Sequence, residues 1–244
     1  GIIPEAMAPL PPRPRDHFHV LTIDYPQYTG LFFNEHKNTL LSNITVRRAL
    51  NLAIPKKSLA KEFYGNEAHA IDTPLLPGVP ILQSAPDGDT VSAKKMIDAW
   101  IESTKPKPIR KTKKGVAPPS EPQKPKLTLT VSSTPGQVAI AQKIADAWNA
   151  IGVTTTLNTV DSAKLKREII KPRAYEVLLF SMKTGAEGDP YAFWHSSQRE
   201  WPGLNLSLLG NPKADALIRD ARTLPRKEAR EEKYKTLAGI ISAE

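Results

Sequence analysis

The feature that most constrains the fold is an alternation of strand-like and helix-like segments in the second half of the chain. Leu127–Val131 alternates apolar and polar residues as a strand does, and residues 137–151 carry an apolar stripe of helical period. Residues 153–159 have strand composition, a short helix opened by an aspartate is expected over 161–170, and Tyr175–Phe180 has strand composition again. Strands separated by helices pair in parallel, so this order predicts an α/β fold with a parallel βαβαβ unit.

The flanking regions add two strands and several helices. Strand composition recurs at His17–Asp24 and at Gly30–Asn34. Apolar residues at helical spacing, together with helix-start residues such as Asn43 and Pro55, mark the remaining helices. We expect these helices over residues 43–53, 55–64, 93–101, 214–221 and 225–241. The whole chain is therefore expected to be a mixed sheet flanked by helices.

The positive charge of the chain is concentrated in one segment. Residues 105–126 hold eight lysine and arginine residues against one glutamate, so they carry +7 of the formal +9. Six prolines and very few large apolar residues predict an extended or disordered surface loop inside the domain. A basic nucleic-acid-binding domain is the alternative that this charge raises. The segment has no aromatic residue for base stacking and no helical period, so we expect no nucleic-acid partner.

Polar residues follow the predicted strands at the edge where parallel sheets bind ligands. Ser133 and Thr134 follow one strand, Lys183 and Thr184 follow another, and Asn205 lies in a later glycine-containing loop. We expect Ser133, Lys183 and Asn205 to form one wall of a ligand-binding cleft. The structural alternatives are that Ser133 and Thr134 cap the following helix, that Lys183 is only solvated, and that Asn205 forms a turn.

Signals of catalysis are missing from the sequence. The chain has no cysteine, no Walker-type or GxGxxG phosphate loop and no nucleophile elbow. His17 and His19 would share one face of a strand, but no third metal ligand stands nearby. The start of the chain lacks a signal peptide, and no apolar run is long enough to cross a bilayer. We expect a ligand-binding protein that is not an enzyme and needs no cofactor or metal.

Three groups of short motifs occur in a fixed order across most of residues 15–244. They are FN…VRRALNLAI…G in residues 33–65, W…IGV in residues 148–153, and DP…F…N…NP..D in residues 189–215. Together they resemble the family 5 extracellular solute-binding proteins, which serve peptide and nickel uptake. The resemblance implies one lobe of a two-lobed periplasmic binding protein of type II, with residues 1–244 forming the second lobe as an excised fragment.

The resemblance also implies a function and partners. The chain would belong to the substrate-binding component of an ABC importer that captures a peptide-like or other small solute by hinge closure. Its partners would be the solute, the missing first lobe and an ABC permease in the membrane. Its location would be extracytoplasmic, either periplasmic or at the cell surface, with the parent protein tethered to the membrane. A scaffold or sensor of the same fold that transports nothing is the alternative.

The sequence departs from the peptide-binding members of this family at three positions. Lys183 and Ala186 stand where the family pattern has the tryptophan and the aspartate that holds a peptide's α-ammonium group. Glu187 is the adjacent candidate for that role. Val131 stands where dipeptide binders place an arginine for the carboxylate. A sugar, a capped peptide or an anionic ligand is therefore as compatible with the sequence as a peptide with free ends.

Overall fold

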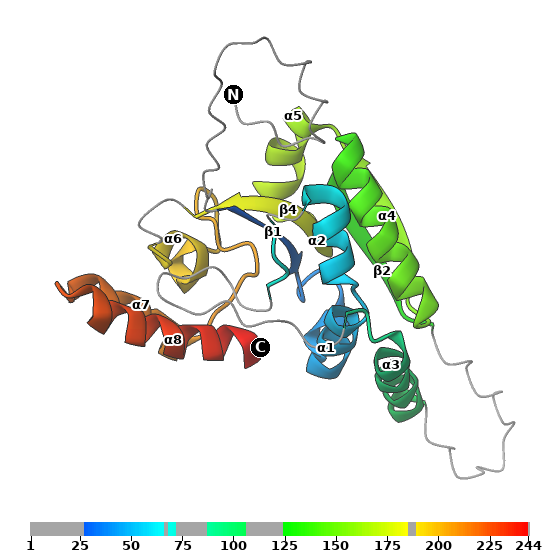
Figure 1. Cartoon of the computed structure of the whole chain (residues 1–244), viewed down its shortest axis with the longest axis horizontal. Coiled ribbons are helices and arrows are strands. Elements are labelled where there is room, and N and C mark those ends of the chain that lie inside the picture. Colours follow the sequence, from blue (N-terminus) through cyan, green and yellow to red (C-terminus); the bar gives the residue numbers. More distant parts are fainter. Residues whose placement is uncertain (1–26, 66–67, 72–86, 106–123, 185–188, 244) are drawn as a thin grey trace, which may run out of the picture.

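A four-stranded mixed sheet forms the centre of the protein. The computed structural model describes residues 27–65, 68–71, 87–105, 124–184 and 189–243 (Figure 1). The strands are β1 (Gln27–Phe33), β2 (Lys126–Ser132), β3 (Thr154–Val160) and β4 (Val177–Lys183), in the spatial order β1-β4-β2-β3. Strand β2 runs parallel to β3 and β4, whereas β1 pairs antiparallel with β4. This arrangement confirms the predicted mixed sheet with a parallel βαβαβ unit.

Two helical crossovers connect the parallel strands. Helix α4 (Pro135–Ala150) leads from β2 to β3, and its first position holds a proline, whose fixed φ suits a helix start. Helix α5 (Ser162–Lys164) continues into η2 (Leu165–Ile170), a π-helical turn that leads toward β4. The Asp161 side chain accepts the backbone N–H of Ala163 at 2.9 Å, so it caps α5 as expected from the sequence.

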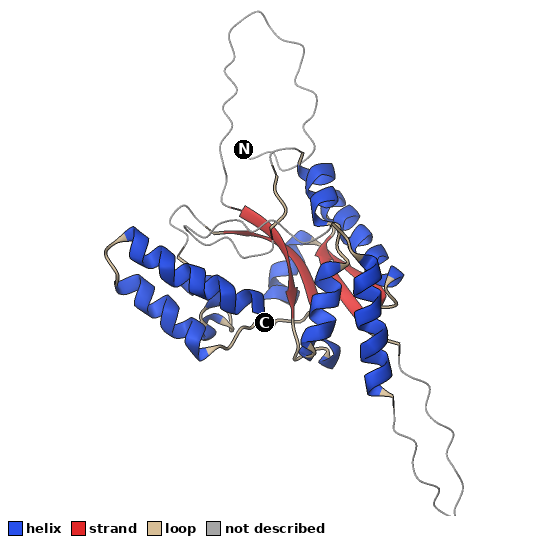
Figure 2. Cartoon of the chain, turned by 60° about the horizontal axis from the view of Figure 1, so that its bottom comes forward, coloured by secondary structure: helices blue, strands red, loops and turns tan. Residues whose placement is uncertain are grey.

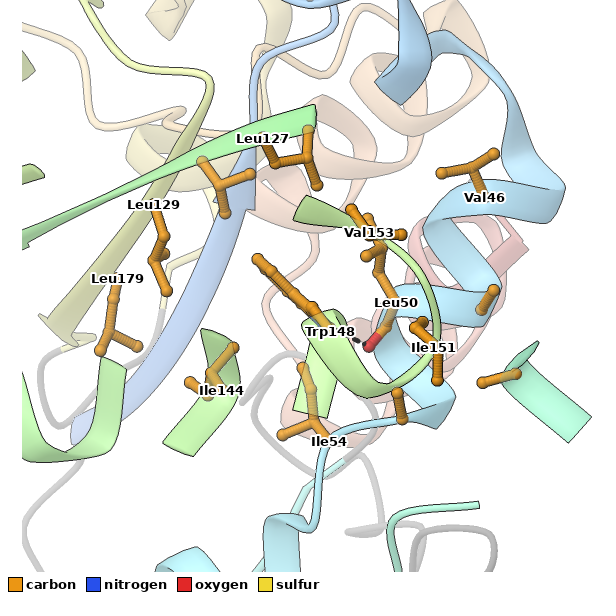
Figure 3. Packing of buried hydrophobic residues seen from close by; sticks show 14 of the residues in the cluster. Val46, Leu50, Ile54, Leu127, Leu129, Ile144, Trp148, Ile151, Val153 and Leu179 are labelled. Atoms are coloured by element: carbon orange, nitrogen blue, oxygen red, sulfur yellow. Dashed lines mark hydrogen bonds between the residues drawn. The ribbon is translucent and has the colours of Figure 1, made fainter. Parts of the chain in front are cut away.

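One face of the sheet is covered by helices and carries the largest apolar cluster. These helices are α4, α1 (Ile44–Leu52), α2 (Lys56–Tyr64) and α3 (Thr90–Thr104). The Asn43 side chain accepts two N–H groups of the first turn of α1, which confirms the predicted helix start. Trp148 and Leu129 are 0% exposed within this cluster, where side chains of α1, α4, β2 and β4 pack together (Figure 3).

The other face of the sheet packs against η2 and a following irregular segment. Phe32, Leu178 and Leu206 belong to this second cluster. Beyond it lie α6 (Tyr191–Trp194), η3 (Ser196–Gln198), α7 (Pro212–Thr223) and α8 (Lys227–Ala243). Helices α7 and α8 pair along a separate apolar cluster on the side of the sheet away from α4 (Figures 1 and 2).

Most predicted elements are present, with boundaries shifted by a few residues. The predicted strand at His17–Asp24 and nearly all of the basic segment 105–126 lie outside the described residues. Trp100 is only partly buried and packs against the rim of the largest apolar cluster. None of the described helices is both long and apolar enough to cross a membrane.

Candidate functional site

The carboxyl ends of the three parallel strands meet at one edge of the sheet. Ser132 pairs with Val160, so β2 and β3 end at the same level. Val177, the first residue of β4, pairs with Leu129 in the middle of β2. Strand β4 therefore extends beyond the ends of β2 and β3 and finishes at Lys183. Because β1 is antiparallel, it begins at this edge, with Gln27 opposite Lys183. Loops that leave this edge can contribute ligand-binding side chains, as in other open α/β sheets.

Ser133 and Thr134 lie at this edge, directly after β2. The Ser133 N–H donates to the carbonyl of Val160 at 2.8 Å, which ties the ends of β2 and β3 together and leaves the Ser133 residue exposed. Thr134 is the residue before α4, but its side chain makes no capping hydrogen bond to the helix. Its hydroxyl instead lies 3.0 Å from the Ser132 hydroxyl. Helix capping, the structural alternative for this residue, is therefore not the role of the Thr134 side chain.

Lys183 and Thr184 lie at the same edge, at the end of β4. Lys183 is the last residue of the strand and is exposed, and Thr184 follows it half-buried. Glu187 falls in residues 185–188, outside the described part of the chain. The structure therefore brings Ser133, Thr134, Lys183 and Thr184 to one edge, as expected.

The expectation that Asn205 faces a ligand is not met. Its side chain is 0% exposed, and its amide nitrogen donates to the carbonyls of His195 at 3.2 Å and Leu209 at 2.9 Å. Its amide oxygen accepts the Leu209 N–H at 3.1 Å. The asparagine uses its hydrogen-bonding groups to hold two turns of backbone together, because buried polar groups require partners. No surface of this side chain remains for a ligand.

Four further polar side chains meet near the end of β4, and sequence reasoning missed them. Thr29 and Ser181 are cross-strand partners on β1 and β4, and their hydroxyl oxygens lie 2.7 Å apart. The Thr29 hydroxyl also lies 3.0 Å from the phenol oxygen of Tyr64, the last residue of α2. Gln137, in the first turn of α4, donates from Nε2 to the same phenol at 3.4 Å. These four residues form the hydroxyl chain, which joins β1, β4, α2 and α4.

A second group of hydroxyls lies beside the end of β3. The Ser132 and Ser162 hydroxyl oxygens are 2.7 Å apart, and Ser132 also contacts Thr134. Hydroxyl groups both donate and accept, so this edge of the sheet can bind polar groups of either kind. The described residues contain no cluster of three or more His, Asp or Glu residues that could hold a metal ion.

Burial keeps one tyrosine next to this edge neutral. Tyr28, the neighbour of Thr29 on β1, points to the opposite face, where its hydroxyl donates to the Met182 sulfur at 3.4 Å. Burial raises the pKa of this phenol far above its ordinary value of 10.0. Tyr28 therefore supports the sheet without adding charge to the edge.

The segment that follows the site is anchored to α7. Asp189 accepts the Tyr191 N–H at 3.0 Å and pairs with Arg222 at 3.1 Å. Asp215 on α7 accepts both the N–H of Ser196, at 2.8 Å, and its hydroxyl, at 2.5 Å. Burial alone would raise the pKa of Asp215, but the two hydrogen bonds from Ser196, together with the nearby His195 and Arg219, outweigh it and lower that pKa. These contacts attach residues 189–196, which connect the sheet to the α7–α8 pair, to helix α7.

Comparison with known proteins places this architecture in a family. The sequence profile described as bacterial extracellular solute-binding proteins, family 5 Middle, matches residues 7–202. No curated protein matches the chain.

Solved structures share the fold at low sequence identity. The chain is similar to the oligopeptide-binding protein AppA from Bacillus subtilis in complex with a nonapeptide, with a TM-score of 0.72, 22% identity and coverage of 90% of this chain and 43% of that chain. It is also similar to DppA from Helicobacter pylori in complex with the peptide STSA, with a TM-score of 0.70, 21% identity and coverage of 89% and 40%. A third similar structure is NikZ from Campylobacter jejuni in complex with Ni(L-His), with a TM-score of 0.69, 19% identity and coverage of 90% and 43%.

The chain thus spans less than half the length of each of these structures. The family profile covers most of the chain, and the mixed sheet agrees with the type II periplasmic binding proteins found by structure. The chain belongs to the family 5 bacterial extracellular solute-binding proteins.

Proposed function

We propose that this chain forms part of the substrate-binding component of an ABC importer, which captures a small solute outside the cytoplasmic membrane. The observation that carries the proposal is the polar edge of the sheet. Ser133, Thr134, Lys183 and Thr184 gather at the carboxyl ends of parallel strands in a fold of the solute-binding family. Open α/β sheets bind their ligands at such edges.

The binding unit is a two-lobed protein in which residues 1–244 supply one lobe. The similar structures support this division, because nine-tenths of this chain corresponds to about two-fifths of each of them. A ligand held against one polar edge becomes enclosed when a second lobe closes over it. The other lobe and a membrane permease are therefore the partners, with membrane tethering supplied by the parent protein.

The ligand is peptide-like or another small polar solute. Val131, where dipeptide binders place an arginine, is 0% exposed within the sheet, so this strand position offers no carboxylate clamp. Lys183 brings a positive charge where the family pattern has an aromatic residue. Both features argue against recognition of a peptide through the family's usual pair of end groups. Among the described residues of this edge, no side chains form the nucleophile–base pair of a hydrolase, and the activity that we propose is capture of a solute without chemistry.

Thermal shift measurements on the full-length gene product test this proposal. The purified protein is screened against amino acids, peptides and sugars, because a ligand at one hundred times its Kd stabilises the folded state by about 2.7 kcal/mol. Ser133→Trp, which places an indole at the exposed strand end, should abolish the shift caused by any solute found. Ser103→Trp, at the exposed end of α3, is the matched control and should keep it. A screen without any shift, or a shift that Ser133→Trp leaves intact, would refute the proposal.

A further inference from the structure

Trp201 holds two lysine ammonium groups close to its ring. The Nζ atom of Lys166 lies 5.2 Å from the centre of the indole ring, and that of Lys171 lies 5.8 Å from it. Both lysine residues are exposed, and the tryptophan is half-buried. A cation within about 6 Å of a ring centre is attracted to the negative face of the ring. The indole therefore gathers two positive charges at one place on the surface.

The π-helical turn η2 brings the two lysines to the same side. The Lys171 N–H donates to the Lys166 carbonyl at 2.9 Å, which is an i→i+5 hydrogen bond. Because this bond closes one turn, the two residues lie one above the other on one face of the helix. In an α-helix, with 3.6 residues per turn, residues five apart would point in different directions.

A buried arginine fixes the indole next to this turn. The guanidinium of Arg173 donates to the carbonyls of Arg199, at 2.8 Å, and Gly203, at 2.7 Å. These carbonyls lie two residues before and two residues after Trp201. The same guanidinium donates to the carbonyl of Ile170, in η2, at 2.7 Å. It thus joins the loop of the tryptophan to the turn of the lysines, and a surface that is already ordered loses less entropy on binding.

The two ammonium groups are not neutralised within the described part of the chain. Neither of them makes an ion pair there, and the neighbouring Glu168 pairs with Arg167 at 2.7 Å. Residues 164–171 and 199–201 together hold five basic side chains against two glutamates, a net charge of +3. The ammonium groups are at most about 11 Å apart, the sum of their distances to the ring centre, so one anionic surface can attract both.

The combination of an indole with lysines favours a membrane surface over a soluble anion. A tryptophan ring is apolar but carries a polar N–H, and it therefore prefers the headgroup level of a bilayer. Lysines beside it are attracted to anionic lipid. Leu204, three residues after Trp201, is 38% exposed and adds an apolar side chain to the same loop. A soluble phosphate would gain nothing from these apolar atoms.

We infer that Trp201, Lys166 and Lys171 form a membrane-binding patch that contacts anionic phospholipids. The lysines bind headgroup phosphates, and the indole lies at the headgroup level between them and the acyl chains. The inference goes beyond solute capture, because the patch is distinct from the polar edge. Turn η2 covers the sheet face opposite to α4, the helix that begins directly after Ser133 and Thr134.

The test mixes the 244-residue chain with lipid vesicles and measures binding by sedimentation. Vesicles of phosphatidylcholine and phosphatidylglycerol should bind the protein, and vesicles of phosphatidylcholine alone should bind it much less. Each lysine near an anionic surface strengthens binding about fivefold. Replacing both, as Lys166→Gln with Lys171→Gln, should therefore weaken binding to the anionic vesicles about 25-fold.

Lys61→Gln with Lys95→Gln is the matched control. These two lysines are exposed on α2 and α3, on the other face of the sheet, and their loss changes the net charge equally. Attraction by the basic segment 105–126 is the same in both double variants. At about 0.1 M salt, charges more than about 10 Å from the membrane are screened, so the control should weaken binding less than about threefold.

Tryptophan fluorescence locates the contact. Lipids that carry bromine on their acyl chains quench an indole that reaches the membrane, and the chain has four tryptophans. Anionic vesicles with such lipids should quench the wild type. Trp201→Phe should remove this quenching, whereas Trp100→Phe, which replaces a half-buried tryptophan on α3, should keep it.

Four results would overturn the inference. They are no binding to anionic vesicles, equal weakening in the two double variants, quenching that Trp201→Phe leaves intact, and release of the vesicles by inorganic phosphate at constant ionic strength. The last result would identify a soluble phosphate as the ligand. None of them bears on the solute screen, because a protein that captures no solute can still bind vesicles through this patch.

Discussion

Replacing Trp148 with phenylalanine tests how helices α4 and α1 are joined in the core. The Trp148 indole N–H donates to the carbonyl of Leu50 at 2.9 Å, across the interface between α4 and α1 (Figure 3). Ile54, the residue whose N–H would bond this carbonyl in a longer helix, donates to Asn51 instead. The indole therefore satisfies a carbonyl that the end of α1 leaves without a helical partner.

The expected change in the free energy of unfolding has two contributions, a lost hydrogen bond and lost packing. Leu50 is 0% exposed, so its carbonyl would lose its partner without gaining water, at a cost of about 1–3 kcal/mol. Trp148 is 0% exposed as well, and the smaller ring leaves a space that costs about 1 kcal/mol more. We expect Trp148→Phe to lower the free energy of unfolding by about 3 kcal/mol, a large fraction of the 5–15 kcal/mol of a typical domain.

Urea denaturation followed by far-UV circular dichroism measures this change. Trp100→Phe is the matched control, because Trp100 lies on α3 at the rim of the same cluster and is only partly buried. We expect it to cost less than about 1 kcal/mol. The reasoning is refuted if Trp148→Phe costs no more than the control.

Two other substitutions test the segment that follows the sheet. A Cβ on Gly203 would lie 2.2 Å from the backbone oxygen of Gln198. Gly203→Ala should therefore lower the free energy of unfolding by about 2 kcal/mol or more in the same urea assay. An unchanged urea midpoint would contradict this close packing. Because the folded-state pKa of Asp215 lies below its ordinary value of 3.8, its hydrogen bonds from Ser196 should stabilise the fold fully above that pH and lose effect as the pH falls through the folded-state pKa. Asp215→Asn should therefore destabilise the protein by about 1–2 kcal/mol at neutral pH and less at pH 3, and an equal loss at both pH values would argue against the assignment.

The order of strands and helices could be predicted because local patterns carry it. Leu127–Val131 alternates in the way a half-buried strand requires, and it forms β2. Asn43 and Asp161 have the side chains that cap helices, and both do so. The π-helical form of residues 165–170 could not be predicted, since its i→i+5 bonds, such as that from Lys171 to Lys166, leave no local mark on residue type.

The candidate site was predictable only where it follows a strand directly. Ser133 and Lys183 could be placed because parallel strands end at a common edge. Thr29 and Tyr64 could not, because their place at this edge depends on the antiparallel pairing of β1 and on where α2 packs. Asn205 was placed wrongly for a physical reason: an asparagine in a loop can bind a ligand or bind the loop itself, and here it does the second.

The reversed direction of β1 has a practical consequence. Because β1 starts opposite the end of β4, Gln27 lies beside Lys183 at the polar edge, and Thr29 follows two residues later. The chain contains no cysteine, so a single thiol introduced at Gln27 would carry a fluorescent dye at one known position. The geometry that brings β1 to this edge thus makes Gln27 a suitable position for a dye that reports the solute binding proposed above.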